Sequence, residues 1–188
     1  MALRIVTGDL SFDELTDHAD IKNLENLKAE DCLVSREKDS FVLCVMSHGE
    51  WGVVLGTDGE KFELKEICPI VGNCELLSNK PSMVFIQACQ GGDMPQADGK
   101  RVEIPHNFLM SFATSPGNSA FRDEDGSGSW YVKDLCSVLN EHYTTTDLVS
   151  MITMVHLEMR YRVGREDGNE VTQSPSNWNT LKFHVYFQ

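Results

Sequence analysis

Apolar residues gather in short runs along the chain, and their spacing predicts strands. Phe41–Met46 (FVLCVM) and Met83–Ala88 (MVFIQA) are uninterrupted and rich in residues that favour strands, a pattern typical of strands covered on both faces. Phe108–Thr114 (FLMSFAT) is similar. The last run, Leu181–Phe187 (LKFHVYF), alternates apolar and polar positions, so it predicts a strand with one buried face.

Other segments carry the three- and four-residue spacing of helices. Ser11 is placed to cap a helix that continues to Lys28, with a capping-box pattern. A second helix opens at Ser129 or Gly128, and a third runs from an Asp147 cap to Arg160. The apolar positions of the second and third helices are Trp130, Leu135, Val138, Leu139, Leu148, Met151, Ile152, Val155 and Met159. Strands that alternate with helices predict an α/β fold with a mostly parallel sheet between helical layers.

Two polar segments interrupt this pattern. Gly91–Pro105 and Gly164–Asn179 contain Gly, Pro, Asp and Asn without a helical or strand period, so we expect exposed loops there. A chain of 188 residues fits a single domain with one core.

Charge and hydropathy narrow the possible partners and locations. The formal net charge of −13 repels phosphate groups, so we expect neither nucleic acid nor a membrane surface as a partner. No apolar run approaches the roughly 18 residues that a membrane span needs. The first residues, Met1 to Gly8, lack the pattern of a secretory signal. We therefore expect a cytoplasmic protein.

The six cysteines are scattered along the chain. A cytoplasmic setting keeps thiols reduced, so we expect no disulfides. The closest pair, Cys68 and Cys74, has neither the spacing of zinc ligands nor an accompanying pair of histidines. The sequence therefore predicts no metal ion and no cofactor.

Two predicted strands run directly into residues with reactive side chains. Phe41–Met46 leads into His48, and Met83–Ala88 leads into Cys89. Active residues of α/β sheets gather at the carboxyl ends of strands, where an imidazole can take the proton of a nearby thiol. The backbone amides of Cys89 and Gly49 are candidates for an oxyanion hole. The alternative is that His48 is a turn residue and Cys89 an inert buried thiol.

The pentapeptide Gln87–Gly91 reads QACQG, and a histidine lies 41 residues upstream of its cysteine. This pattern matches a signature of the caspase family of cysteine endopeptidases, which the chain resembles in several further segments. The other matching segments are Ser47–Glu50 around that histidine, the hairpin Gly56–Gly59, Ser115–Gly117 leading to Phe121–Arg122, and Gly128–Tyr131. The resemblance implies a three-layer α-β-α domain with an antiparallel C-terminal edge strand.

The resemblance also assigns roles to individual residues. It implies that Cys89 is the nucleophile and His48 the general acid/base, with Gly49 beside them. The residues that it places around the substrate, and above all around an aspartate side chain, are Gln87, Ser119, Ala120, Phe121, Arg122 and Trp130. A guanidinium such as that of Arg122 is suited to a carboxylate because it donates two parallel hydrogen bonds. Ser119 stands where the family usually has an aromatic ring, which implies a wider neighbouring pocket.

The family pattern further divides the chain into parts. Residues 1–92 resemble a large subunit, residues 93–105 an intersubunit linker, and residues 106–188 a small subunit, so the chain resembles a zymogen. Asp98 is the candidate site of self-cleavage in the linker. The resemblance also implies a homodimer, or a heterodimer with another caspase, formed through Leu181–Phe187.

One departure concerns the aspartate pocket. The family's pocket has a second arginine, placed on a first strand well upstream of the histidine. Leu3–Leu15 resembles the family's second strand and the start of its second helix, so the first strand and first helix are missing from this pattern. Arg4 and Arg36 do not lie in a matching context.

Three hypotheses of function follow. The first is a cysteine endopeptidase that cleaves proteins after aspartate, in apoptosis or a related proteolytic cascade. The second is a non-catalytic homologue that regulates a full-length caspase by dimerisation or substrate capture. The third, a nucleotide-binding protein, finds no support because neither G-x-G-x-x-G nor G-x-x-x-x-G-K-[ST] occurs.

Overall fold

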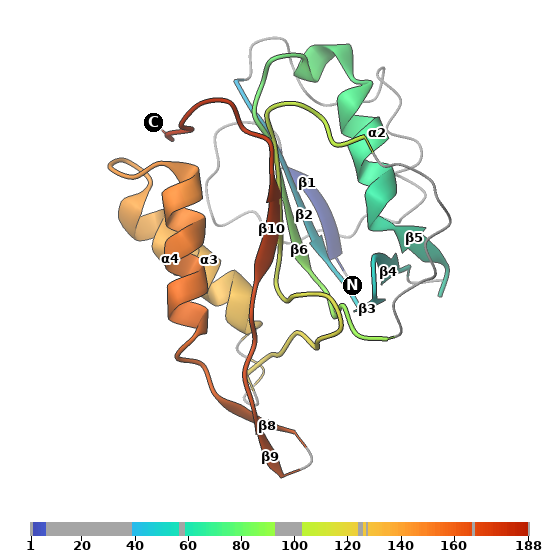
Figure 1. Cartoon of the computed structure of the whole chain (residues 1–188), viewed down its shortest axis with the longest axis vertical. Coiled ribbons are helices and arrows are strands. Elements are labelled where there is room, and N and C mark those ends of the chain that lie inside the picture. Colours follow the sequence, from blue (N-terminus) through green and yellow to red (C-terminus); the bar gives the residue numbers. More distant parts are fainter. Residues whose placement is uncertain are drawn as a thin grey trace.

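A mixed sheet of five strands forms the centre of the molecule (Figure 1). The computed structural model describes residues 2–6, 39–56, 59–92, 103–123, 126, 128–166 and 168–187. In order across the sheet the strands are β1 (Ala2–Val6), β2 (Phe41–Met46), β6 (Ser82–Gln87), β7 (Phe108–Phe112) and β10 (Ser176–Asn179). The three central strands are parallel, and β1 and β10 pair antiparallel at the two edges.

The predicted central strands are confirmed. β2 has the predicted bounds, and β6 and β7 lie within one or two residues of theirs. Every residue of β6 and β7 is buried, as expected of strands covered on both faces. β2 alternates buried and partly buried residues, so one of its faces is covered less completely than the other.

Helices cover both faces of the sheet, so the predicted α/β fold is confirmed. On one face lie α3 (Trp130–His142) and α4 (Leu148–Met159), packed against Met83, Phe85 and Leu109. On the other face lies α2 (Ile67–Gly72), packed against strand residues of the opposite parity such as Val84 and Ile86. Alternate residues of one strand therefore enter two separate cores. Figure 1 shows α3 and α4 on one side of the sheet and α2 on the other.

The predicted caps of α3 and α4 are present. The Ser129 side chain accepts a hydrogen bond from the Val132 amide at 3.3 Å. The Asp147 carboxylate accepts from the Val149 and Ser150 amides at 3.1 and 3.3 Å. Each cap satisfies amide donors that the first helical turn leaves without a helical partner.

Of the elements between β2 and β6, only the hairpin at Gly56–Gly59 was expected from the sequence, and the others were missed. The elements in this stretch are a small antiparallel sheet of β3 (Gly49–Glu50), β4 (Val53–Leu55) and β5 (Lys61–Glu63), the 3-10 helices η2 (Leu64–Glu66) and η3 (Glu75–Leu77), and α2 between them. α2 is only six residues long, too short for a helical period to be recognised. It contains Pro69, which the first turn of a helix accepts because its amide has no helical partner there.

The prediction of a strand at Leu181–Phe187 is wrong. The chain leaves the sheet after β10, and no residue of this segment belongs to a strand. The Asn179 side chain accepts a hydrogen bond from the Leu181 amide at 2.9 Å, and the Asn107 side chain accepts from the Lys182 amide at 3.3 Å. Such side-chain bonds compete with ladder bonds and turn the chain.

The alternation of this segment has another cause. Leu181, Val185 and Phe187 pack against the core of α3 and α4, and the Val185 carbonyl accepts from the Leu148 amide at 2.8 Å. The antiparallel C-terminal edge strand exists, but it is β10, whose sequence SNWN is polar.

The prediction of a loop over Gly164–Asn179 is also wrong. It contains β10 and a hairpin of β8 (Gly164–Glu166) and β9 (Asn169–Val171). Gly168 has φ +80°, a conformation that suits a hairpin turn. The Asp-Gly dipeptide before β9 was the available signal.

Three other predictions concern residues outside those described. They are the helix from Ser11 to Lys28, the self-cleavage residue Asp98, and most of the exposed connection Gly91–Pro105.

Candidate active site

The sheet register brings His48 and Cys89 to the ends of two neighbouring strands. β2 and β6 are parallel, with Met46 opposite Gln87, so each reactive residue lies two positions beyond this pair. The Ser47 amide donates to the Gln87 carbonyl at 3.0 Å, which continues the pairing toward the site. His48 is exposed and Cys89 partly buried. Both residues therefore lie at the carboxyl edge of the sheet, where the His48 side chain is open to solvent.

Gly49 lies directly against the backbone around Cys89. A Cβ atom at Gly49 would come within 2.8 Å of the Cys89 carbonyl oxygen, 2.9 Å of the Ala88 Cβ and 2.7 Å of the Val53 carbonyl oxygen. These distances are shorter than side chains tolerate. The position therefore requires glycine, and the close approach fixes the backbone after His48 against that of Cys89.

The Gly49 amide points away from the small sheet. The Leu55 amide donates to the His48 carbonyl at 2.9 Å, so His48 and Leu55 form a hydrogen-bonded pair. Hydrogen-bonded and non-hydrogen-bonded pairs alternate along an antiparallel ladder. Gly49, opposite Val54, is thus in a non-hydrogen-bonded pair, which directs its N–H away from β4.

Gln90 connects three loops at this edge. Its side-chain oxygen accepts from the Gly52 amide at 3.1 Å. Its backbone amide donates to the Asn118 carbonyl at 2.9 Å, and its backbone carbonyl accepts from the Gly117 amide at 2.7 Å. The loops after β2, β6 and β7 are therefore held to one another, although they are far apart in the sequence. Sequence analysis did not single out Gln90 as a site residue.

The Cys89 thiol contacts the segment that follows β7. The Ala120 amide lies 3.4 Å from Sγ, within range to donate to it, and Sγ lies 3.8 Å from the Ala120 carbonyl oxygen. The structure thus brings Cys89, His48, Gly49 and Ala120 together. Ser119, next to Ala120, is partly buried.

Gln87 and Arg122 differ in their surroundings. Gln87 is 5% exposed, and its buried side-chain oxygen finds no hydrogen-bond partner among the residues that the structure describes. Arg122 is exposed and forms an isolated antiparallel bridge with Ser129. A buried amide oxygen without a partner is unusual in proteins. Among the described residues, no hydrogen bond joins Gln87 to Arg122.

Phe121 and Trp130 form an aromatic pair, with ring centroids 5.3 Å apart. Gln173 fixes their position, since its side-chain oxygen accepts from the Phe121 amide at 2.6 Å and its nitrogen donates to the Ala113 carbonyl at 2.7 Å. Gly164 lies against the Trp130 ring, where a Cβ would approach a ring carbon to 2.7 Å. Gln173 and Gly164 lie in the segment that was predicted to be a loop, and neither was predicted as a site residue.

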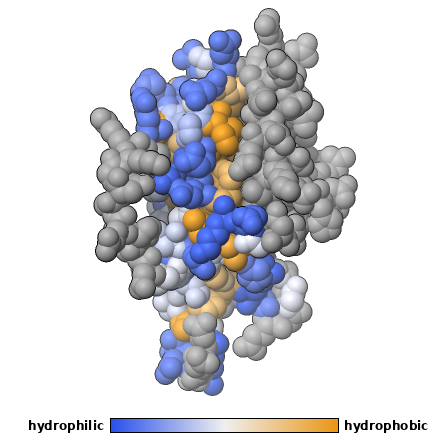
Figure 2. Space-filling view, turned by 90° about the vertical axis from the view of Figure 1, so that its right-hand side faces the viewer, coloured by the Kyte–Doolittle hydropathy of each residue, from blue (hydrophilic) through white to orange (hydrophobic). Residues whose placement is uncertain are grey.

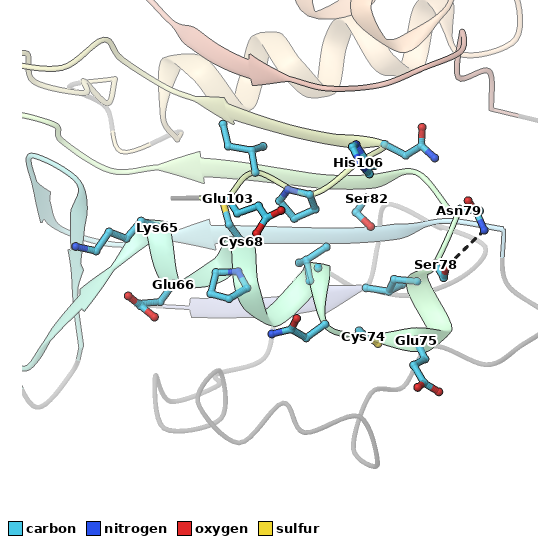
Figure 3. Close-up of a pocket in the computed structure, with 18 of the residues that line it drawn as sticks. Lys65, Glu66, Cys68, Cys74, Glu75, Ser78, Asn79, Ser82, Glu103 and His106 are labelled. Atoms are coloured by element: carbon cyan, nitrogen blue, oxygen red, sulfur yellow. Dashed lines mark hydrogen bonds between the residues drawn. The ribbon is translucent and has the colours of Figure 1, made fainter. Parts of the chain in front are cut away.

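Figure 3 shows a cavity of about 940 Å³ whose lining includes neither Cys89 nor His48. Residues of α2 and η3, the start of β6 and residues 103–107 line it. Figure 3 shows Cys68, Glu103 and His106 on its walls. Figure 2 shows one face of the molecule, on which an apolar band runs down the middle with polar residues beside it. This cavity includes no predicted site residue.

Within the described ranges, no group of three or more His, Cys, Asp or Glu side chains is placed to hold a metal ion. A helix long and apolar enough to cross a membrane is likewise not found among the described residues.

Comparisons with known proteins agree with the motifs. A family model of the caspase domain matches residues 8–186. Mouse caspase-8 is 30% identical over 95% of this chain and 41% of its own length. Chicken caspase-7 is 35% identical over 62% of this chain and 43% of its own length. The chain thus spans about two fifths of these relatives.

A solved structure of caspase-1 from Spodoptera frugiperda has a similar fold. Its TM-score is 0.74 with 22% sequence identity, over 88% of this chain and 69% of that one.

Proposed function

Because the chain belongs to the caspase family, we propose that it is a cysteine endopeptidase that cleaves proteins after aspartate. The observation that carries this proposal is the register of β2 and β6, which places His48 and Cys89 at equivalent positions beyond Met46 and Gln87. The close approach of Gly49 to the Cys89 carbonyl oxygen supports the same arrangement.

In the proposed mechanism, the His48 imidazole takes the proton of the Cys89 thiol, and the thiolate attacks the carbonyl carbon of the scissile peptide bond. The amides of Gly49 and Cys89 stabilise the oxyanion of the tetrahedral intermediate. His48 then gives its proton to the leaving amine, and a thioester to Cys89 remains. Water, deprotonated by His48, hydrolyses the thioester and restores the thiol.

Specificity for aspartate rests on the groups that flank Cys89. The exposed guanidinium of Arg122 is free to approach a substrate carboxylate from solvent. The buried side chain of Gln87, whose oxygen has no hydrogen-bond partner within the described part of the chain, adds a polar amide. The aromatic pair of Phe121 and Trp130 is proposed to line the neighbouring subsites, together with Ser119 and Ala120.

We further propose that the chain acts in the cytoplasm, in apoptosis or a related cascade, as a zymogen. Cleavage at Asp98, in the linker 93–105, would separate residues 1–92 from residues 106–188. Dimerisation, with itself or another caspase, is proposed to use the open edge of β10, because an edge strand leaves backbone groups unpaired. Trp178 on β10 and the nearby Phe183 are exposed, which supports a contact there.

A fluorogenic peptide that ends in aspartate tests the proposal. The purified chain should release the fluorophore, and Cys89→Ala and His48→Ala should each lower kcat by at least about a thousandfold, because the two groups act as a unit. Cys136→Ala, which changes a partly buried thiol on α3, is the matched control and should keep full activity. Equal turnover by Cys89→Ala and the original chain would remove the proposed nucleophile. A folded chain without turnover that alters the activity of a full-length caspase would favour the regulatory hypothesis.

A further inference from the structure

Arg162 lies at the centre of a cluster of charges beside the proposed substrate loop. Its Nε donates to Asp134 Oδ2 at 2.7 Å and its Nη2 to Asp134 Oδ1 at 2.5 Å. This two-point contact joins α3 to the residues just after α4. Both side chains are largely buried, with 26% and 12% of their surface exposed. The hydrogen bond from Arg162 to Asp134 also raises the pKa of Arg162, so the guanidinium remains charged.

The same cluster holds Asp123. Lys133 Nζ lies 2.6 Å from Asp123 Oδ2, and Arg162 Nη1 lies 3.7 Å from Asp123 Oδ1. Asp123 is 23% exposed, so solvent screens these contacts less than it screens an ordinary surface pair. Two cations, Lys133 on α3 and Arg162 just after α4, therefore share the Asp123 carboxylate.

Asp123 is the residue after Arg122, the proposed partner of the substrate carboxylate. Arg122 pairs with Ser129 in an antiparallel bridge, and the Asp123 amide donates to the Gly128 carbonyl at 2.9 Å. Neighbouring side chains of extended backbone point to opposite sides. When Asp123 is held on Lys133 and Arg162, Arg122 is directed to the other side, where it is exposed.

A carboxylate one residue from Arg122 is a potential competitor of the substrate. Because it is tethered, its effective concentration is far higher than that of a dissolved peptide. We propose that Arg162 and Lys133 hold the Asp123 carboxylate away from Arg122, so that Arg122 stays available for the aspartate of the substrate. This inference rests on the proposed function, and it makes Arg162 a positioning residue for substrate specificity.

The test compares KM and kcat for an aspartyl peptide. Arg162→Met should raise KM by about fivefold or more, since an ion pair with a charged hydrogen bond is lost, while kcat changes less than about twofold. Asp123→Asn added to Arg162→Met should bring KM back to within about twofold of the original chain, because the neutral amide competes weakly. A role of Arg162 in packing alone predicts no such rescue, so failure of the rescue overturns the proposal.

Arg160→Met is the matched control. Arg160 lies two residues before Arg162, its guanidinium is 5.2 Å from the centre of the Tyr161 ring, and its hydrogen bond goes to the Tyr161 hydroxyl at 3.3 Å. Its replacement should leave KM unchanged. A rise in KM equal to that of Arg162→Met would mean that loss of positive charge alone is responsible, against the proposal.

A second measurement does not depend on turnover. Hydrogen exchange of the Arg122 Nε–H, followed by NMR, should slow in Arg162→Met, because Asp123 then pairs with Arg122, and should return to the original rate when Asp123→Asn is added. An unchanged exchange rate in Arg162→Met refutes the proposal that Arg162 holds Asp123 away from Arg122, whether or not the chain cleaves peptides. If the exchange rate slows but no variant cleaves an aspartyl peptide, Arg162 does hold Asp123 away from Arg122, and the proposed protease function fails.

Discussion

Replacing Gly49 with alanine tests how closely the two reactive loops are packed. The added Cβ would lie 2.7 Å from the Val53 carbonyl oxygen, 2.8 Å from the Cys89 carbonyl oxygen and 2.9 Å from the Ala88 Cβ. Two of these three neighbours are backbone atoms, which cannot rotate out of the way. Either the loop after β2 moves, or the end of β6 does.

The size of the effect follows from this contact. Overpacking costs about 1–3 kcal/mol, and the rigid neighbours place Gly49→Ala near the upper figure. At roughly 2–4 °C per kcal/mol for a domain of this size, the midpoint of thermal unfolding should fall by about 6–12 °C. A shift of the Gly49 amide should also lower kcat by on the order of a hundredfold, the cost of losing one oxyanion donor.

Urea unfolding, thermal unfolding and peptide cleavage measure these effects together. Gly91→Ala is the control, since a Cβ at Gly91 has no heavy atom within 4 Å, and its free energy of unfolding should change by less than about 0.5 kcal/mol. If Gly49→Ala is as stable and active as Gly91→Ala, the loops do not approach each other as the structure describes.

Three other changes have expected outcomes. Arg122→Lys keeps the charge but loses the two-point geometry, so the ratio of cleavage after aspartate to cleavage after asparagine should fall by about tenfold; an unchanged ratio would remove Arg122 from the pocket. Hydrogen bonds from Ser150, above all, hold the pKa of Asp147 below its ordinary value of 3.8. Ionised Asp147 therefore stabilises the fold above that pH and loses this contribution as the pH falls through the lowered pKa; Asp147→Ala should cost about 1 kcal/mol near neutral pH and less in acid, as measured by urea unfolding at each pH. Burial raises the pKa of Cys44 to about 12 and that of Cys68 to about 11, so iodoacetamide at pH 7.5 should leave both thiols unmodified until the chain unfolds, and their rapid labelling in mass spectra of the folded chain would contradict this.

The sequence predicted those elements whose own residues carry the pattern. Phe41–Met46 is apolar enough to be a strand in any context, and Ser129 and Asp147 cap helices through contacts within the first turn. β10 shows the limit of such reasoning. Its residues, Ser176–Asn179, are mostly polar, and they form a strand because β7 offers an open row of backbone groups. The residues of β10 and their neighbours in the sequence do not reveal this long-range pairing.

The candidate site divides in the same way. His48 and Cys89 were predicted because strand ends and a family signature mark them. Gln90, Gln173 and Arg162 were missed, since each acts through contacts with segments more than 25 residues away. Polar residues of this kind look like ordinary surface residues in a sequence. Their partners become visible only in three dimensions.

The close packing of Gly49 against the Cys89 carbonyl has a consequence for the register in which β2 pairs with β6. If β2 slipped by two residues along β6, every apolar side chain would keep its face of the sheet, because the strand repeats every second residue. His48 would nevertheless move by about 6.6 Å relative to Cys89, at roughly 3.3 Å per residue. Burial of apolar side chains is equally compatible with both registers of β2. Only one of them brings Gly49 into contact with the Cys89 backbone. Gly49 thus selects the register of β2 against β6. It distinguishes the register that places His48 beside Cys89 from a register that would bury the same side chains without forming the site.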